Sequence, residues 1–275
     1  MFSRDSSTLR EGQYRTPKNL GARAALHRRF TVSPVEHNTW IFNYLRRYGP
    51  TEAHVLEVGC GPGGMWVAQQ AAIPDNWRLN LTDASDGMVS AARAAHTQAG
   101  LDDVRYQVVD ITHLPFTANS FDLVIGNYMM YHVPDIPRAV SEVARVLRPG
   151  RKFCAVTNGL THLGELHAVV RATLPGKRFG SPRTLEDWPF VLENGKALLS
   201  EGFAFVERHN MKGHLAVTEP EPLVDYVLST VDSGFDTYTE DEVAQLHEAF
   251  AARIAEGNGT FKISKASGMF VAWNP

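Results

Sequence analysis

The chain alternates short apolar runs with amphipathic segments between residue 50 and about residue 157. Most runs are rich in valine, leucine and isoleucine, as buried parallel strands are, and a helix-like segment follows most of them. The runs that we expect to form strands cover residues 55–58, 77–83, 104–111, 121–127 and 152–157. This order of strands and helices predicts an α/β fold built on a parallel sheet.

Helical patterns flank this region on both sides. Before it, apolar spacing predicts one helix over residues 22–30 and a second that begins at Ser33-Pro34 and ends at Gly49-Pro50. After it, the pattern predicts a helix opening at Thr161, a helix over residues 184–201, a sixth strand over 203–209, two helices within 220–256 and a seventh strand over 261–273.

The turn after the first strand is rich in glycine. Residues 59–64 read Gly-Cys-Gly-Pro-Gly-Gly, and the spacing of Gly59, Gly61 and Gly64 fits the fingerprint of dinucleotide-binding proteins. Glycine reaches positive φ without a Cβ penalty and lets a ligand approach the backbone, and the helix that follows presents unpaired N–H groups. The segment therefore predicts a ligand site, although this fingerprint alone does not name the ligand.

Acidic residues at three predicted strands narrow the class of ligand. Glu57 lies inside the first strand, Asp83 ends the second and Asp110 lies at the end of the third. A carboxylate at Glu57 repels a pyrophosphate but attracts a ligand that carries an ammonium and a sulfonium, as S-adenosylmethionine does. Asp83 is placed to accept hydrogen bonds from two ribose hydroxyls, a device that NAD enzymes share, and the alternative for Asp83 is a plain helix N-cap.

Composition and charge bear on the partners and the compartment. The formal charge is −3 and the pI is near 6.4, so a nucleic-acid substrate would need a local basic patch. The two cysteines, Cys60 and Cys154, favour a reducing compartment over a disulfide framework. No apolar run approaches the roughly 18 residues of a membrane span and no signal peptide is expected, so we predict a cytoplasmic protein.

Residues 57–64, Glu-Val-Gly-Cys-Gly-Pro-Gly-Gly, resemble the first motif of class I S-adenosylmethionine-dependent methyltransferases. Residues 119–124, 131–135 and 139–150 are similar to the methyltransferases of ubiquinone and menaquinone biosynthesis. The resemblance covers about residues 50–157, and a dinucleotide-dehydrogenase interpretation predicts nothing of the segment around Tyr131.

The resemblance implies a Rossmann-like fold with a seven-stranded, mostly parallel sheet, an antiparallel last strand and helices on both faces. Residues 1–49 would form an N-terminal helical lid. Residues 50–275 would form the class I methyltransferase domain, with cap insertions at about 159–201 and 218–257. The residues expected to line the acceptor site, with core packing as the alternative for each, are Phe179, Trp188, Phe190, His214 and Tyr226.

The cofactor that the resemblance implies is S-adenosyl-L-methionine. An aromatic face at Tyr14 would add a cation–π contact to the sulfonium. Asp110 would contact the adenine amino group, and Met88 would pack near the adenosine, with a core methionine as the alternative. The expected cofactor-binding residues are Tyr14, Glu57, Gly59, Cys60, Gly61, Asp83, Ala84, Met88, Asp110, Ile111 and Asn127.

Three residues are candidates for the catalytic site. His132 follows the fourth strand and could take the acceptor proton, because an imidazole titrates near neutral pH, and its alternative is to cap a helix beginning at Pro134. His162 and Glu165 lie three apart, so a helix would point both into one cleft, against the alternative of a solvated face. No zinc-binding spacing occurs, so we expect no metal.

These patterns predict an S-adenosylmethionine-dependent methyltransferase that acts on an oxygen, nitrogen or activated carbon of a small organic molecule, in secondary-metabolite or quinone-like biosynthesis. The alternatives are an NAD-dependent oxidoreductase, a catalytically inactive cofactor-binding scaffold and an RNA methyltransferase. The expected partner is a small-molecule substrate, with no nucleic acid and no membrane, and a homodimer is a possible assembly.

Overall fold

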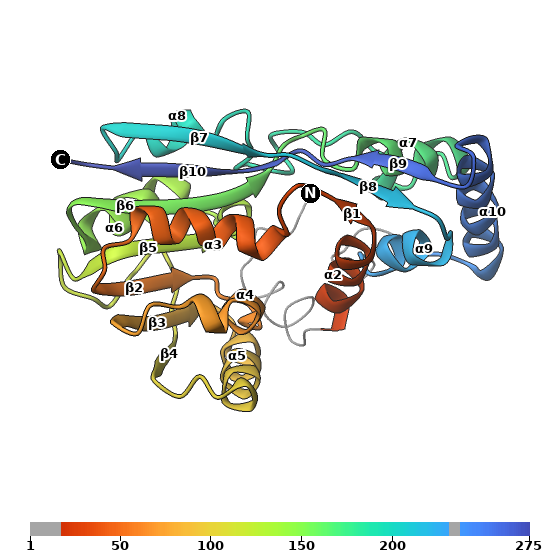
Figure 1. Ribbon diagram of the computed structural model, residues 1–275. Coiled ribbons are helices and arrows are strands. Elements are labelled where there is room, and N and C mark those ends of the chain that lie inside the picture. Colours follow the sequence, from red (N-terminus) through yellow and green to blue (C-terminus); the bar gives the residue numbers. More distant parts are fainter. Residues whose placement is uncertain (1–17, 231–236) are drawn as a thin grey trace.

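The computed structural model describes residues 18–230 and 237–275, so Tyr14 lies outside the described residues. A seven-stranded sheet with the order β4-β3-β2-β5-β6-β10-β7 forms its larger part (Figure 1). Its strands are β2 (Ala53–Val58), β3 (Trp77–Asp83), β4 (Val104–Val108), β5 (Phe121–Asn127), β6 (Leu147–Asn158), β7 (Phe205–Met211) and β10 (Ser267–Trp273). In this spatial order, the neighbouring strands β4, β3, β2, β5 and β6 all pair in parallel.

The last strand of the chain runs against its neighbours. β10 pairs antiparallel with both β6 and β7, so that Ser267 lies opposite Asn158 on one side and Met211 on the other. The expected seven-stranded, mostly parallel sheet with an antiparallel last strand is therefore confirmed.

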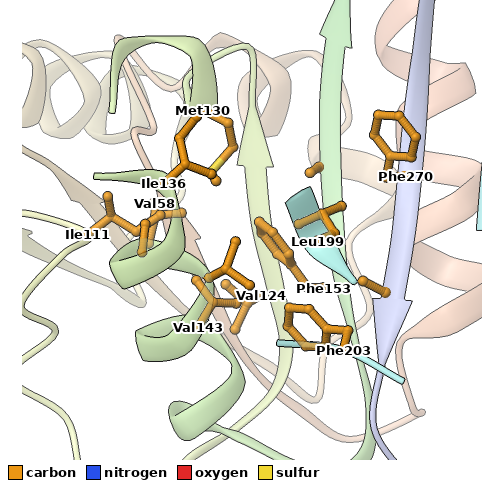
Figure 2. Close-up of a cluster of buried hydrophobic side chains, with 14 of the residues drawn as sticks. Val58, Ile111, Val124, Met130, Ile136, Val143, Phe153, Leu199, Phe203 and Phe270 are labelled. Carbon is orange, nitrogen blue, oxygen red and sulfur yellow. The ribbon is translucent and has the colours of Figure 1, made fainter. Parts of the chain in front are cut away.

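Helices cover both faces of this sheet, as expected. α3 (His37–Tyr48), α4 (Gly64–Ala68) and α5 (Asp86–Ala99) pack on one face, and α6 (Ile136–Val146) and α8 (Gly195–Leu199) pack on the other. Figure 2 shows the hydrophobic core between the sheet and the helices α6 and α8. There, Val143 of α6 and Leu199 of α8 lie near Val124 and Phe153 of the sheet. Full burial of one such side chain contributes about 1.5–3 kcal/mol.

A smaller layer, which we call the cap, lies beyond the carboxyl ends of the parallel strands (Figure 1). It consists of α2 (Lys18–Phe30), α7 (Gly164–Thr173), α9 (Glu221–Leu228), α10 (Glu240–Glu256) and an antiparallel sheet of β1 (Thr31–Val32), β8 (His214–Val217) and β9 (Phe261–Ser264). Its core includes Leu26, Leu166, Leu215 and Phe250. The two N-terminal helices therefore separate, since α2 packs in the cap and α3 packs on the main sheet.

Two long strands connect the main sheet with the cap. β7 runs on into β8, and β9 runs on into β10, with only Lys212-Gly213 and Lys265-Ala266 between them. The prediction of one strand over residues 261–273 is wrong, because the segment changes partners: β9 pairs with β8, whereas β10 pairs with β6 and β7. Gly213 permits the break, since its φ is 152° and an added Cβ would lie 3.0 Å from the Val32 carbonyl oxygen.

Two helices, α3 and α7, begin later than predicted. α3 begins at His37 and not at Ser33-Pro34, since the Glu36 carboxylate accepts a hydrogen bond from the Thr39 N–H at 2.8 Å. α7 begins at Gly164 and not at Thr161, after a residue in the left-handed region. The later start of α7 leaves His162 outside the helix.

The helix predicted over residues 184–201 is wrong, because only α8 is helical there. Pro189 has no N–H to donate, and the Asn194 side chain donates to the Pro189 carbonyl and accepts from the Val191 N–H, which closes a turn instead.

Within residues 18–230 and 237–275, no helix is long and apolar enough to cross a membrane.

A buried acid fastens α6 to the loop before β5. The Glu142 carboxylate accepts hydrogen bonds from Arg145 Nε at 2.9 Å and Nη2 at 2.8 Å, and from the Leu114 N–H at 2.9 Å. Arg145 also donates to the Leu114 and Phe116 carbonyls. The hydrogen bonds from Arg145, together with the other donors and cations, lower the pKa of Glu142 to about 2.

We predict that Glu142→Gln lowers the free energy of unfolding by about 2–4 kcal/mol at pH 7, because it leaves Arg145 without its carboxylate. The difference from wild type should narrow below pH 4.5, where the unfolded Glu142 takes up a proton that the folded residue does not. Urea unfolding at several pH values measures both effects. The matched control is Glu256→Gln, which breaks an exposed pair with Arg253 at the same spacing and should cost under about 1 kcal/mol. Equal losses in the two variants would contradict the prediction.

Candidate functional site

The glycine-rich turn connects β2 to α4 and is shaped by three positive φ angles. These are 66° at Gly59, 54° at Gly61 and 72° at Gly63. A Cβ on Gly59 would approach Met129 Cβ to 2.7 Å, whereas a Cβ on Gly61 would meet no atom within 4 Å. Gly59 is therefore required by packing, and Gly61 borders open space at the end of the strand.

A buried histidine holds this turn from behind. His96 on α5 is fully buried, with Nε2 2.9 Å from the Gly63 carbonyl and Nδ1 2.7 Å from the Tyr106 hydroxyl. A Cβ on Gly63 would lie 2.5 Å from that Nε2 atom. His96 therefore fixes the turn against α5 and β4, a role that no sequence motif indicated.

Glu57 is the most enclosed acid of the site. Its side chain is 3% exposed, and its carboxylate accepts hydrogen bonds from Trp66 Nε1 at 2.6 Å and from Asn127 Nδ2 at 3.0 Å. Burial raises the pKa of Glu57 to about 7, although these two hydrogen bonds act in the opposite direction. The Asn127 Oδ1 atom is also buried and has no hydrogen-bond partner. An acceptor atom and a carboxyl group with a raised pKa thus lie together at the end of β2 and β5.

Asp83 at the end of β3 connects two loops. Its Oδ2 atom accepts from the Gly61 N–H at 3.0 Å, and its Oδ1 atom accepts from the Ser85 N–H at 2.9 Å. The helix N-cap is not Asp83 but Ser85, whose hydroxyl accepts from the Met88 N–H. Asp83 therefore ties the glycine turn to the start of α5.

Asp110 closes a turn of its own beyond β4. Its Oδ1 atom accepts from the Thr112 N–H at 2.9 Å and from the Thr112 hydroxyl at 2.8 Å. The Val109 N–H donates to the Asp83 carbonyl at 2.9 Å, so the ends of β3 and β4 stay together. Asp110 therefore lies just beyond the end of β4, at the same edge of the sheet as Asp83.

Some of the remaining predicted cofactor residues lie at the carboxyl ends of the parallel strands, and the side chains of others are buried. Gly59, Gly61 and Asn127 share the edge with Glu57 and Asp83 through the contacts given above. The side chains of Cys60, Met88 and Ile111 are buried, at 8%, 1% and 6% exposure, while Ala84 between Asp83 and Ser85 is partly exposed.

His132 lies in the short turn η2 (Met130–His132), a few residues after β5. Burial, with a contribution from the Arg23 charge, lowers the pKa of His132 to about 4, so its imidazole is neutral at pH 7. The Tyr131 ring packs edge-on against it, with ring centroids 4.5 Å apart. The alternative in which His132 caps the next helix does not hold, since Asp135 caps α6.

The structure does not bring His162 and Glu165 together. The Glu165 carboxylate accepts from the Ser264 N–H at 2.9 Å, which fastens α7 to β9. His162 lies before the helix, is 3% exposed, and stacks on His27 with ring centroids 5.8 Å apart. Its Nδ1 atom is 3.4 Å from the Ser267 hydroxyl at the start of β10. Only His162 therefore reaches the junction of the cap and the main sheet.

Two basic side chains at this junction were not predicted as site residues. Arg183 packs over the Trp188 ring, with its guanidinium carbon 4.5 Å from the ring centroid. Lys265, between β9 and β10, donates to the Thr31 hydroxyl at 3.2 Å. Burial lowers the pKa of each, and their charges help to lower the pKa of His162 well below its ordinary value. The loop of residues 177–183 carries three basic residues, but the sequence does not show which of them lacks an acidic partner.

The predicted acceptor-lining residues have different surroundings. Phe190 is fully buried in the main-sheet core, and Phe179 is buried in the cap core. Trp188 and Tyr226 lie near Arg183 and His27 respectively, and His214 is in β8. In the part of the chain that the structure describes, no three His, Cys, Asp or Glu side chains are grouped to hold a metal ion.

In comparison with known sequences, residues 55–150 match a family described as a methyltransferase domain. The demethylmenaquinone methyltransferase of Symbiobacterium thermophilum is 34% identical over 101 residues, which are 36% of this chain and 40% of that protein. The methyltransferase GfsG of Streptomyces halstedii is 29% identical over 201 residues, which are 71% of this chain and 67% of that protein.

Comparison of folds agrees with this result. The phosphoethanolamine N-methyltransferase 2 of Haemonchus contortus, solved with phosphomonomethylethanolamine and S-adenosylhomocysteine, has a TM-score of 0.58 and 21% identity over 98% of this chain and 59% of its own. At this identity the likeness concerns the fold. The chain spans 40% to 67% of the length of the first curated relatives, so these matches identify the domain and not the reaction of the whole chain.

We predict that S-adenosylhomocysteine binds with release of a proton from Glu57 near pH 6, because the ligand's ammonium favours the carboxylate over the carboxylic acid. Since the pKa of Glu57 is about 7 without ligand, affinity should fall about tenfold between pH 7.5 and pH 6. Calorimetric titrations in buffers of different ionisation enthalpy measure the number of protons released.

Glu57→Gln should bind the ligand more weakly without proton release at any pH. Asp83→Asn serves as the control, since it should weaken binding but keep the proton release. A wild-type affinity that does not change between pH 6 and pH 7.5 would contradict this prediction.

Proposed function

We propose that this chain, whose residues 55–150 match a family of methyltransferase domains, transfers a methyl group from S-adenosylmethionine to a small organic molecule. The observation that supports this most is the meeting of Glu57, Asp83 and Asn127 at the carboxyl ends of three neighbouring parallel strands. In open α/β sheets, ligands bind at this edge.

The residues at the edge fit the cofactor. The Asn127 Oδ1 atom is buried without a donor, and Glu57 carries a carboxyl group whose pKa burial has raised. An ammonium group would donate to the first and stabilise the ionised form of the second. Asp83, next to the open space at Gly61, offers carboxylate oxygens for ribose hydroxyls.

When bound, S-adenosylmethionine supplies a methyl group on a positively charged sulfur. The chain's own contribution is to hold the two reactants in line and to accept the acceptor's proton where it has one. His132 is our candidate for that proton acceptor, because it follows β5 and its imidazole is neutral at pH 7. His162 is a candidate for contact with the acceptor, and Glu165 is bound to β9 instead.

A small organic acceptor fits this chain better than RNA. The formal charge is −3, and the aromatic ring of Tyr131, a few residues beyond the end of β5, packs against that of Trp188. One of the relatives is a demethylmenaquinone methyltransferase. We further propose a cytoplasmic protein in which the N-terminal residues act as a lid over the cofactor.

We predict that the wild-type protein binds S-adenosylhomocysteine with a micromolar dissociation constant, about −8 kcal/mol. Asp83→Ala should bind at least tenfold more weakly, because it removes the acceptors for the ribose hydroxyls and loosens the glycine turn. The exposed Asp103→Ala is the control and should bind like wild type. Calorimetric titration measures all three.

Absence of wild-type binding in a folded sample would overturn the cofactor assignment, and tight NADH binding in its place would support the oxidoreductase alternative. Binding without transfer of labelled methyl groups to any small molecule of a cell extract would support the inactive scaffold. Salt-sensitive RNA binding would support the RNA methyltransferase.

We predict that His132→Asn lowers kcat by about 10²-fold or more with little change in KM, measured with labelled cofactor and an acceptor found in that extract. His247→Asn on α10 is the control, since His247 is exposed and pairs only with Glu221 among the described residues. An unchanged kcat in His132→Asn would leave proximity alone as the source of catalysis.

A further inference from the structure

Among the residues that the structure describes, no acidic side chain pairs with Arg183. It lies in the loop between η3 (Arg178–Gly180) and α8, and its Nε atom is buried with no hydrogen-bond partner. Its Nη2 atom is 3.4 Å from His167 Nε2, and its guanidinium stacks over the Trp188 ring. Within residues 18–230 and 237–275, no carboxylate forms a salt bridge with Arg183. Its positive charge is therefore not neutralised by any side chain that the structure describes.

The other basic residues of the same loop are paired. Lys177 Nζ lies 2.8 Å from a Glu242 oxygen, and Arg178 Nη2 lies 2.8 Å from an Asp187 oxygen. Acids are thus available near this loop, and they are used by its other two cations. Of these three basic residues, Arg183 alone has no acidic partner in the described part of the chain.

The groups around Arg183 keep it in place without neutralising it. His167 Nδ1 is 2.5 Å from the Phe179 carbonyl, which can only accept, so Nδ1 carries the proton and Nε2 accepts from Arg183. Burial and the Arg183 charge lower the pKa of His167 to about 4, so this imidazole is neutral at pH 7. His162, which Arg183 also influences, is likewise held neutral.

Contacts between rings connect Arg183 to the end of β5. The Trp188 ring meets the Tyr131 ring with centroids 4.9 Å apart, and Tyr131 in turn packs against His132. Arg183 therefore lies on the cap side of the residues that follow Asn127. This is the side from which an acceptor would approach a cofactor held by Glu57 and Asp83.

An enclosed guanidinium with no counter-charge is unfavourable unless an anion is bound there for part of the working cycle. Arginine presents Nε and Nη donors in a planar fork that matches the two oxygens of a carboxylate. The Arg183 Nε atom has no hydrogen-bond partner, so Nε and the adjacent Nη2 form one donor pair that could bind a carboxylate. The aromatic rings of Trp188 and Tyr131 lie next to this guanidinium and make its surroundings apolar.

We propose that Arg183 binds a carboxylate of the acceptor, so that the methyl acceptor is a small organic acid with an apolar or aromatic body. This inference rests on the proposed function, because it names the class of substrate for the same site. Arg183 determines acceptor binding and takes no part in holding the cofactor. Its loss should raise the acceptor KM far more than it lowers kcat.

The test measures binding of small carboxylates to the protein saturated with S-adenosylhomocysteine. The probes are benzoate, salicylate, phenylacetate and decanoate, each compared with its amide by calorimetric titration. We expect at least one carboxylate to bind and its amide to bind at least tenfold more weakly. Arg183→Met should lose at least tenfold in affinity for that carboxylate while its affinity for S-adenosylhomocysteine stays unchanged.

Two variants serve as controls. Arg253→Met removes an exposed arginine on α10 and should bind both ligands like wild type. Arg183→Lys keeps the charge but loses the planar fork, so it should fold and bind the carboxylate with intermediate affinity. It provides the test if Arg183→Met does not fold.

The outcomes separate this inference from the proposed function. If the folded wild-type protein did not bind S-adenosylhomocysteine, the proposed function would be overturned. Intact cofactor binding would overturn the role of Arg183 if acids and amides bound equally, if none of the carboxylates bound, or if the Arg183 variants bound the acid like wild type.

Discussion

The buried carboxyl group of Glu57 is the constraint on which the site depends. It stands in the central strand β2, where water cannot solvate its charge, and it is held by one donor from α4 and one from β5. These two hydrogen bonds fix the glycine turn and Asn127 relative to each other before any ligand arrives. Burial makes ionisation of this carboxyl group less favourable, and its pKa is accordingly raised to about 7. A ligand with a positive group near β2 offsets this effect, so cofactor recognition and local stability are coupled.

The main sheet, and the edge at which Glu57, Asp83 and Asn127 meet, could be predicted from the sequence because their signals are local. Each parallel strand is a short apolar run, and parallel strands end at the same edge, so acids following successive runs must come close together. Glu57, Asp83 and Asn127 meet for this reason. Trp66, which holds Glu57, and His96, which holds the glycine turn, carried no signal in the sequence beyond their aromatic character.

The cap could not be predicted in the same detail because its contacts join residues far apart in the chain. The phase of a helix depends on its first residue, and the later start of α7 removed His162 from the face it was expected to share with Glu165. The difference between Arg183 and Lys177 depends on Glu242, which approaches from α10 on the far side of the cap. Composition alone treats the basic residues of the loop as equivalent.

The two strands shared by the main sheet and the cap also bear on how such a chain can diverge. The cap helices α9 and α10 are inserted between β8 and β9, whose other ends continue directly into β7 and β10. Exchange or lengthening of the segment between Val217 and Phe261 would leave the register of β10 with β6 and β7 intact. Such a change would alter the cap helices α9 and α10 and leave the strand order of the main sheet as it is.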